Sequence, residues 1–87
     1  MNRKKINTCA GNSIMVNTSS KDCLKFGVLS GDRVEFMEQK RIGIVEGVTE
    51  SSLDNDNVIW VTFSGDSGAT FFEKKDFKGF ILPDVYI

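Results

Sequence analysis

Histidine is absent from the 87 residues of this chain. It is the usual general base of enzymes and the commonest transition-metal ligand, so ordinary catalytic triads cannot be built. Cys9 and Cys23 are too few to close a zinc site without it. The run 54–57 imitates the start of a calcium loop, but Ile59 takes the required glycine position, which favours a solvated turn. We therefore predict no enzymatic activity, no bound metal and no cofactor.

One short run resembles a nucleophile motif. Gly65-Asp66-Ser67-Gly68 is similar to the signature of chymotrypsin-like serine proteases, but no histidine is available to activate the serine. The chain is also about half as long as that double-barrel fold requires. Glycines flanking Asp and Ser are typical of a hairpin turn, which is our interpretation of this run.

Aromatic residues carry the remaining chemical signal, with seven Phe, one Trp and one Tyr. Alternation along 57–63 places Ile59, Val61 and Phe63 on one apolar side and Trp60 on the other. Phe71 and Phe72 are adjacent, so they point to opposite faces of a strand. Trp60 and one of this pair would form an external platform that can stack a peptide side chain, a methylated ammonium or a nucleobase. The alternative is that residues 1–19 or the tail 84–87 cover it.

The elements that must position these residues are short strands separated by glycine and acidic turns. Period-2 alternation predicts strands over 33–37, 41–49, 57–63, 69–73 and 80–82, with a further short strand at 14–16. We predict an all-β fold, a small antiparallel barrel of about five strands, with short helical turns near 21–26 and 74–78. The residues expected inside are Val34, Phe36, Ile42, Ile44, Val48, Phe63 and Phe80.

Composition predicts one domain. Residues 1–13 are polar and typical of a flexible arm or linker, and residues 14–87 are expected to form a single small barrel. Residues 1–43 carry eight Lys or Arg and four Asp or Glu, and residues 44–87 carry three and eight. The halves therefore have net charges of +4 and -5. No signal-like apolar segment is present, so we expect an intracellular, monomeric domain with two free thiols and no membrane association.

Three segments carry a family resemblance. Ser30 to Val34, Gly43 to Val48 and Val58 to Phe63 resemble the small SH3-like barrels of the Tudor and KOW type, over about residues 28–82. Tudor-like members bind methylated Lys or Arg in an aromatic cage, and KOW-like members bind RNA or proteins. The resemblance implies cage positions at Trp60, Phe63, Phe71 and Phe72, with Asp66 or Glu73 as the acidic partner.

These observations favour a non-enzymatic interaction module, part of a larger protein, that binds a protein or peptide segment. The residues expected to bind it are Trp60, Phe63, Phe71, Phe72 and Glu73. The first alternative is a nucleic-acid-binding module using the basic residues Arg3, Lys4, Lys5, Lys40 and Arg41. The second is a purely structural repeat unit without a ligand.

Overall fold

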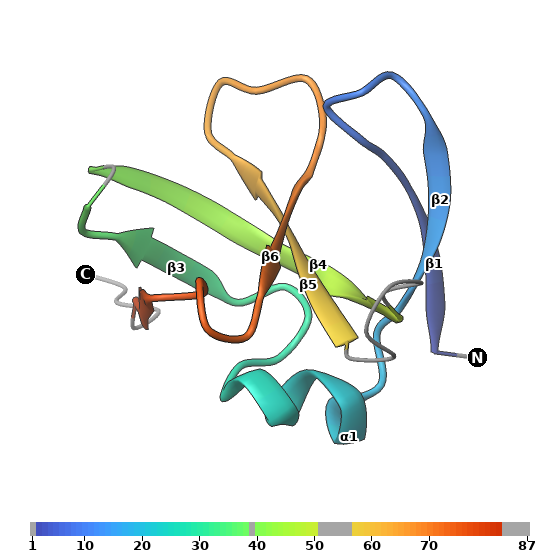
Figure 1. Cartoon of the computed structure of the whole chain (residues 1–87), viewed down its shortest axis with the longest axis horizontal. Coiled ribbons are helices and arrows are strands. Elements are labelled where there is room, and N and C mark those ends of the chain that lie inside the picture. Colours follow the sequence, from blue (N-terminus) through green and yellow to red (C-terminus); the bar gives the residue numbers. More distant parts are fainter. Residues whose placement is uncertain (1, 39, 51–56, 83–87) are drawn as a thin grey trace, which may run out of the picture.

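The computed structural model describes residues 2–38, 40–50 and 57–82 of the chain. Within these ranges it is mostly β, with seven strands in one antiparallel sheet, one short helix and a 3-10 turn (Figure 1). The elements are β1 Arg3–Asn7, β2 Ser13–Asn17, α1 Ser20–Cys23, η1 Leu24–Phe26, β3 Arg33–Phe36, β4 Arg41–Glu50, β5 Asn57–Phe63, β6 Thr70–Glu73 and β7 Gly79–Ile81. The all-β, antiparallel prediction is confirmed.

The long strand β4 organises the sheet. It pairs with β3 and β2 along one edge and with β5 along the other, and the outer strands β1, β7 and β6 extend the sheet from there. Among the residues described, the pairing of the named strands does not close the sheet into a barrel. What brings its two ends together is a single bridge between Thr8, after β1, and Ala69, before β6. In Figure 1 the turns beside these two residues lie next to each other.

The first residues differ from the predicted arm. Arg3–Asn7 forms strand β1, in register with Ser13–Asn17. Ile6 is its one buried residue, and it packs with Val16 and Ala69. With one buried side chain in five residues, this strand has nearly the composition of a linker. The hydrophobic pattern therefore did not predict it.

The first predicted helical turn is confirmed, and the second is a single hydrogen-bonded turn that does not continue into a helix. Ser19 caps α1 by accepting a hydrogen bond from the Asp22 backbone N–H, and Gly27 ends η1 in the left-handed conformation. After β6, the Glu73 carbonyl accepts hydrogen bonds from the backbone N–H groups of Asp76 and Phe77, which closes one turn of the chain before β7.

A β-bulge reverses the expected faces in the first half of β4. Glu46 is the extra residue between Val45, which pairs with Val61, and Gly47, which pairs with Trp60. The bulge lets Val45 and Val48 both face the core, although they are three positions apart. The prediction that Ile42 and Ile44 face inward is therefore wrong, because they follow the opposite alternation and are exposed.

Gly43 faces inward in place of the two isoleucines. A Cβ atom at this position would lie 2.5 Å from Val61 Cγ1, so the packed side chains of β5 leave room only for glycine. The main core comprises Cys23, Val28, Val34, Phe36, Val45, Val48, Ile59, Val61 and Phe63, with Phe26, Phe72 and Phe77 packed against it.

Phe80 lies outside this core, contrary to the prediction. It is the cross-strand partner of Glu35 on β3 and lies on the outward face of the sheet, where 63% of its surface is exposed. Phe77, from the turn before β7, packs against Phe36 at a ring distance of 5.5 Å and fills that end of the core instead. An edge strand of three residues gives no alternation long enough to assign its faces from sequence.

Other predictions fall on residues that are not described. The calcium-like run 54–57 lies mostly, and the tail 84–87 wholly, outside the described residues. Among the residues that are described, no helix is long and apolar enough to cross a membrane.

Candidate functional site

Trp60 and Phe71 form an aromatic pair on the outward face of β5 and β6. The two residues are direct cross-strand partners, with ring centroids 5.3 Å apart and ring planes tilted by 53°. Phe71 is 55% exposed. Cross-strand aromatic pairs of this kind hold each other in place, so the exposed ring of Phe71 lies on a fixed support.

Trp60 is held by contacts with the rest of the fold. Its Nε1–H donates a hydrogen bond of 2.8 Å to Thr49 Oγ1 on β4. Its ring packs against the small apolar cluster that the β1–β2 hairpin makes with Ala69. The alternative prediction, that residues 1–19 cover the platform, therefore holds for one side of Trp60. Phe71 remains open to solvent.

The other aromatic residues assigned to the binding site lie in the core. Phe72 stacks on Phe36 with ring centroids 5.0 Å apart, and Phe63 meets the same Phe36 ring edge-on, also at 5.0 Å. Phe71 and Phe72 therefore point to opposite faces, as predicted. The structure brings Trp60 and Phe71 together but places Phe63 and Phe72 on the other side of the sheet.

Glu73 lies two residues beyond Phe71 on β6, so both side chains project from the same face of the strand. Its side chain is 41% exposed and its Oε2 lies 3.4 Å from Lys75 Nζ. An exposed pair at this distance contributes little to stability, which leaves the Glu73 carboxylate available to a ligand.

The five basic residues assigned to nucleic-acid binding lie in two places. Arg3, Lys4 and Lys5 are on β1, whereas Lys40 and Arg41 are at the β3–β4 turn on the far side of the molecule (Figure 1). Two of them are already paired with carboxylates. Lys4 Nζ lies 2.6 Å from Glu46 Oε1, and Arg41 Nη2 lies 2.7 Å from Asp66 Oδ1.

Arg41 also covers the end of the core. Its guanidinium carbon lies 4.5 Å from the centroid of the Phe63 ring. The five basic residues are thus divided between two places, and two of them are engaged in ion pairs.

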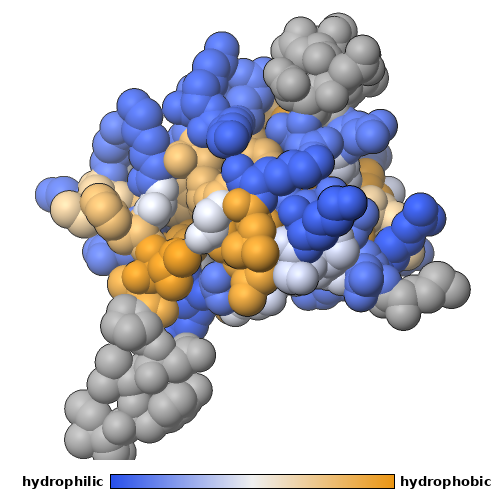
Figure 2. Space-filling view, turned by 90° about the horizontal axis from the view of Figure 1, so that it is seen from below, coloured by the Kyte–Doolittle hydropathy of each residue, from blue (hydrophilic) through white to orange (hydrophobic). Residues whose placement is uncertain are grey.

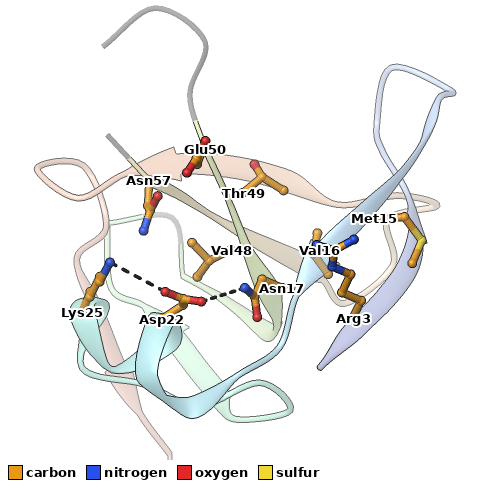
Figure 3. A pocket seen from close by; sticks show the side chains of 10 residues that line it. All are labelled: Arg3, Met15, Val16, Asn17, Asp22, Lys25, Val48, Thr49, Glu50 and Asn57. Carbon is orange, nitrogen blue, oxygen red and sulfur yellow. Dashed lines mark hydrogen bonds and ion pairs between the residues drawn. The ribbon is translucent and has the colours of Figure 1, made fainter. Parts of the chain in front are cut away.

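A polar hollow of about 450 Å³ separates the β1–β2 hairpin from α1 and the ends of β4 and β5 (Figure 3). Asp22 is its central acid, but its carboxylate already accepts from Asn17 Nδ2 at 2.7 Å and Ser19 Oγ at 2.9 Å, and Lys25 lies beside it. Within the described ranges, no buried side-chain nitrogen or oxygen lacks a hydrogen-bond partner.

Apolar residues that the sequence pattern assigned to the core lie on the outward face of β4 and β7, on either side of the charged outward residues Arg33 and Glu35 of β3. Ile42, Ile44 and Phe80 are exposed there. A shallow hollow of about 310 Å³ lies over Ile42 and Ile44, with Arg33 and Glu46 among its lining residues. In the view from below, apolar surface gathers on the side of the molecule on which β7 lies, with charged side chains around it (Figure 2).

The two thiols differ in their surroundings. Cys23 is fully buried in the main core, and burial raises the pKa of its thiol, with Asp22 and Asp32 adding to the rise. Cys9 is exposed, and its Sγ lies 3.1 Å from the Gly68 carbonyl oxygen and 3.2 Å from Thr70 Oγ1. Among the described residues, no three His, Cys, Asp or Glu side chains are grouped so that they could hold a metal ion.

Comparisons of this chain with protein-family models, with curated proteins and with solved structures found no match.

Proposed function

We propose that this chain is a non-enzymatic protein-binding module, and that an extended segment of another protein binds against Phe71 and Trp60. The single observation that carries the proposal is the exposed Phe71 ring, supported from below by Trp60 at 5.3 Å. Aromatic residues that are large, rigid and half-open to solvent are the usual energetic centres of protein interfaces.

The exposed part of Phe71 is large enough to contribute measurable affinity. Burying a whole Phe side chain removes about 200 Å² from water, so covering the open half of this one stabilises a complex by about 2 kcal/mol. Trp60 is already held by Thr49, so little conformational entropy is lost when a ligand binds there. The neighbouring Glu73 gives the site a negative charge that favours a basic ligand.

The finer assignment to the SH3-like type belongs to the same proposal. β3, β4, β5 and β6 pair consecutively, and β7 returns to pair with β3. The bulge in β4 bends that strand so that it contributes to two parts of the sheet. These connections support the resemblance of residues 28–82 to the small SH3-like barrels, with the β1–β2 hairpin and α1 added before them.

Selection from a random-peptide display library tests the function. The affinities of peptides enriched on the wild-type domain are measured for Phe71→Ala and for Phe80→Ala, which removes a similarly exposed phenylalanine from β7. We expect Phe71→Ala to weaken binding about tenfold or more and Phe80→Ala to change it less than about twofold.

The proposal is overturned if Phe71→Ala leaves the affinity unchanged, if Phe80→Ala is the damaging variant, or if no peptide is enriched. Neither substitution is expected to unfold the domain, because both rings are mostly outside the core. Circular dichroism of each variant verifies that the fold is retained.

A further inference from the structure

Strand β6 has an open edge beside Phe71. Its one partner strand among the described residues is β5. On its other edge the chain after β1 reaches only as far as Ala69, where the Ala69 N–H donates to Asn7 and the Ala69 carbonyl accepts from the Cys9 N–H. Beyond that point the chain leaves β6 and turns toward β2.

The direction of the backbone groups on this edge follows from those two hydrogen bonds. In a strand, the N–H and C=O of one residue point to the same side, and those of the next residue point to the other. Both groups of Ala69 point away from β5, so those of Phe71 and Glu73 do as well. The Glu73 carbonyl is used by the following turn. The Phe71 N–H, the Phe71 C=O and the Glu73 N–H have no partner within 2–38, 40–50 and 57–82.

We propose that the bound segment adds to β6 as an antiparallel strand, an inference that rests on the proposed function. Its central residue exchanges two backbone hydrogen bonds with Phe71, and its side chain then lies on the outward face against the Phe71 ring. Backbone hydrogen bonds supply affinity for any extended chain, and the aromatic pair selects an apolar side chain at one position.

The carboxylate of Glu73 defines a second position in the ligand. In an antiparallel pair, the ligand residue opposite Glu73 comes two positions before the residue opposite Phe71. Its side chain lies on the same face as the Glu73 carboxylate, which selects Lys or Arg. Ala69 is occupied by the β1 turn, so the ligand strand has to end soon after its apolar residue. The ligand is therefore an extended segment with the order basic, any residue, apolar.

The probe is the acetylated and amidated peptide Thr-Lys-Thr-Phe-Ser-Gly, titrated into the ¹⁵N-labelled domain and followed by NMR. A second peptide carries an N-methyl group on the Phe amide, which removes the donor to the Phe71 carbonyl and leaves every side chain in place. A third exchanges Lys for Glu. We expect both changes to weaken binding about tenfold or more, since each removes one of the two recognition elements.

A charge exchange provides the matched control. The Glu73→Lys domain is expected to prefer the Glu peptide over the Lys peptide, reversing the wild-type order. Strand addition is overturned if N-methylation changes the affinity by less than about twofold, if the charge exchange does not reverse the preference, or if the Lys peptide does not bind. If any of these results is obtained but library peptides still require Phe71, strand addition is wrong and the protein-binding function stands. Failure of the one proposal can therefore be distinguished from failure of the other.

Discussion

The indole N–H of Trp60 donates to Thr49 Oγ1 across the β4–β5 ladder at 2.8 Å, and this hydrogen bond sets the orientation of the ring on which Phe71 rests. A partly buried donor that loses its acceptor carries a desolvation cost. The bond therefore links the stability of the sheet to the shape of the candidate binding surface.

Thr49→Val is expected to lower the free energy of unfolding by about 1 kcal/mol, because valine keeps the β-branched shape and removes only the acceptor. In a Trp60→Phe background the same substitution is expected to cost little, since the donor is gone. Urea unfolding of the four proteins of this double-mutant cycle gives the coupling energy. An equal cost of Thr49→Val in both backgrounds contradicts the role assigned to this hydrogen bond.

Gly68→Ala is expected to loosen the contact between the β1–β2 turn and β6. An added Cβ would lie 2.5 Å from the Thr8 carbonyl carbon and oxygen, and backbone atoms cannot rotate away as a side chain can. We expect a loss of about 2 kcal/mol in stability and faster labelling of Cys9, whose thiol lies 3.1 Å from the Gly68 carbonyl.

Gly65→Ala is the control, since a Cβ at this position meets no atom within 4 Å although its φ of +90° disfavours a side chain. It is expected to destabilise the domain without changing the rate at which Cys9 reacts with a thiol reagent. Equal labelling rates in the wild type and in Gly68→Ala argue against the contact.

Cys23 is expected to make stability fall at alkaline pH. Burial raises the pKa of its thiol in the folded protein, so the unfolded chain releases this proton first as the pH rises. The stabilisation contributed by the protonated Cys23 thiol is complete below about pH 8. It is lost progressively above the pKa of the thiol in the unfolded chain, about 8.5. The stability advantage of the wild type over Cys23→Ala should therefore shrink between about pH 8 and pH 10.

Urea unfolding at several pH values measures this change, with Cys9→Ala as the matched exposed control. A constant difference between the wild type and Cys23→Ala across this range would show that the thiol does not titrate differently in the folded and unfolded states.

Much of the fold could be predicted from local pattern. The alternation in 57–63 correctly placed Ile59, Val61 and Phe63 inside and Trp60 on the other face, because β5 is long and pairs with two neighbours. The helical turn expected near 21–26 ends at Gly27, as a glycine stop predicts, but its capping residue is Ser19 and Ser20 is already the first residue of the helix. Uninterrupted periodicity and capping residues are strong local signals.

The remaining features depend on contacts that the pattern does not contain. The bulge at Glu46 shifts the alternation of β4 by one residue, so Ile42 and Ile44 were assigned to the wrong face. Gly43 and Gly47 adjoin that region and were the available signal, since glycine in a strand often marks a bulge or a close approach. β1 depends on Ile6 alone, and its pairing with β2 is visible only in three dimensions.

The candidate site was predictable in part for the same reason. Adjacent residues on one strand must face opposite ways, so one of Phe71 and Phe72 had to be external. Which of the two it was depends on the stacking of Phe72 against Phe36, a contact between residues far apart in the sequence. The cage positions implied by the resemblance could not separate Phe63, which is buried, from Trp60, which is not.

The most direct measurement is the map of amide and indole chemical-shift changes when a display-selected peptide is titrated into the ¹⁵N-labelled domain. The proposed function predicts that the largest changes fall on the Trp60 indole N–H and on the Phe71 and Glu73 amides, with Phe71→Ala abolishing them. Changes centred instead on Ile42, Ile44 and Phe80, with the Trp60 indole signal unmoved, would contradict it.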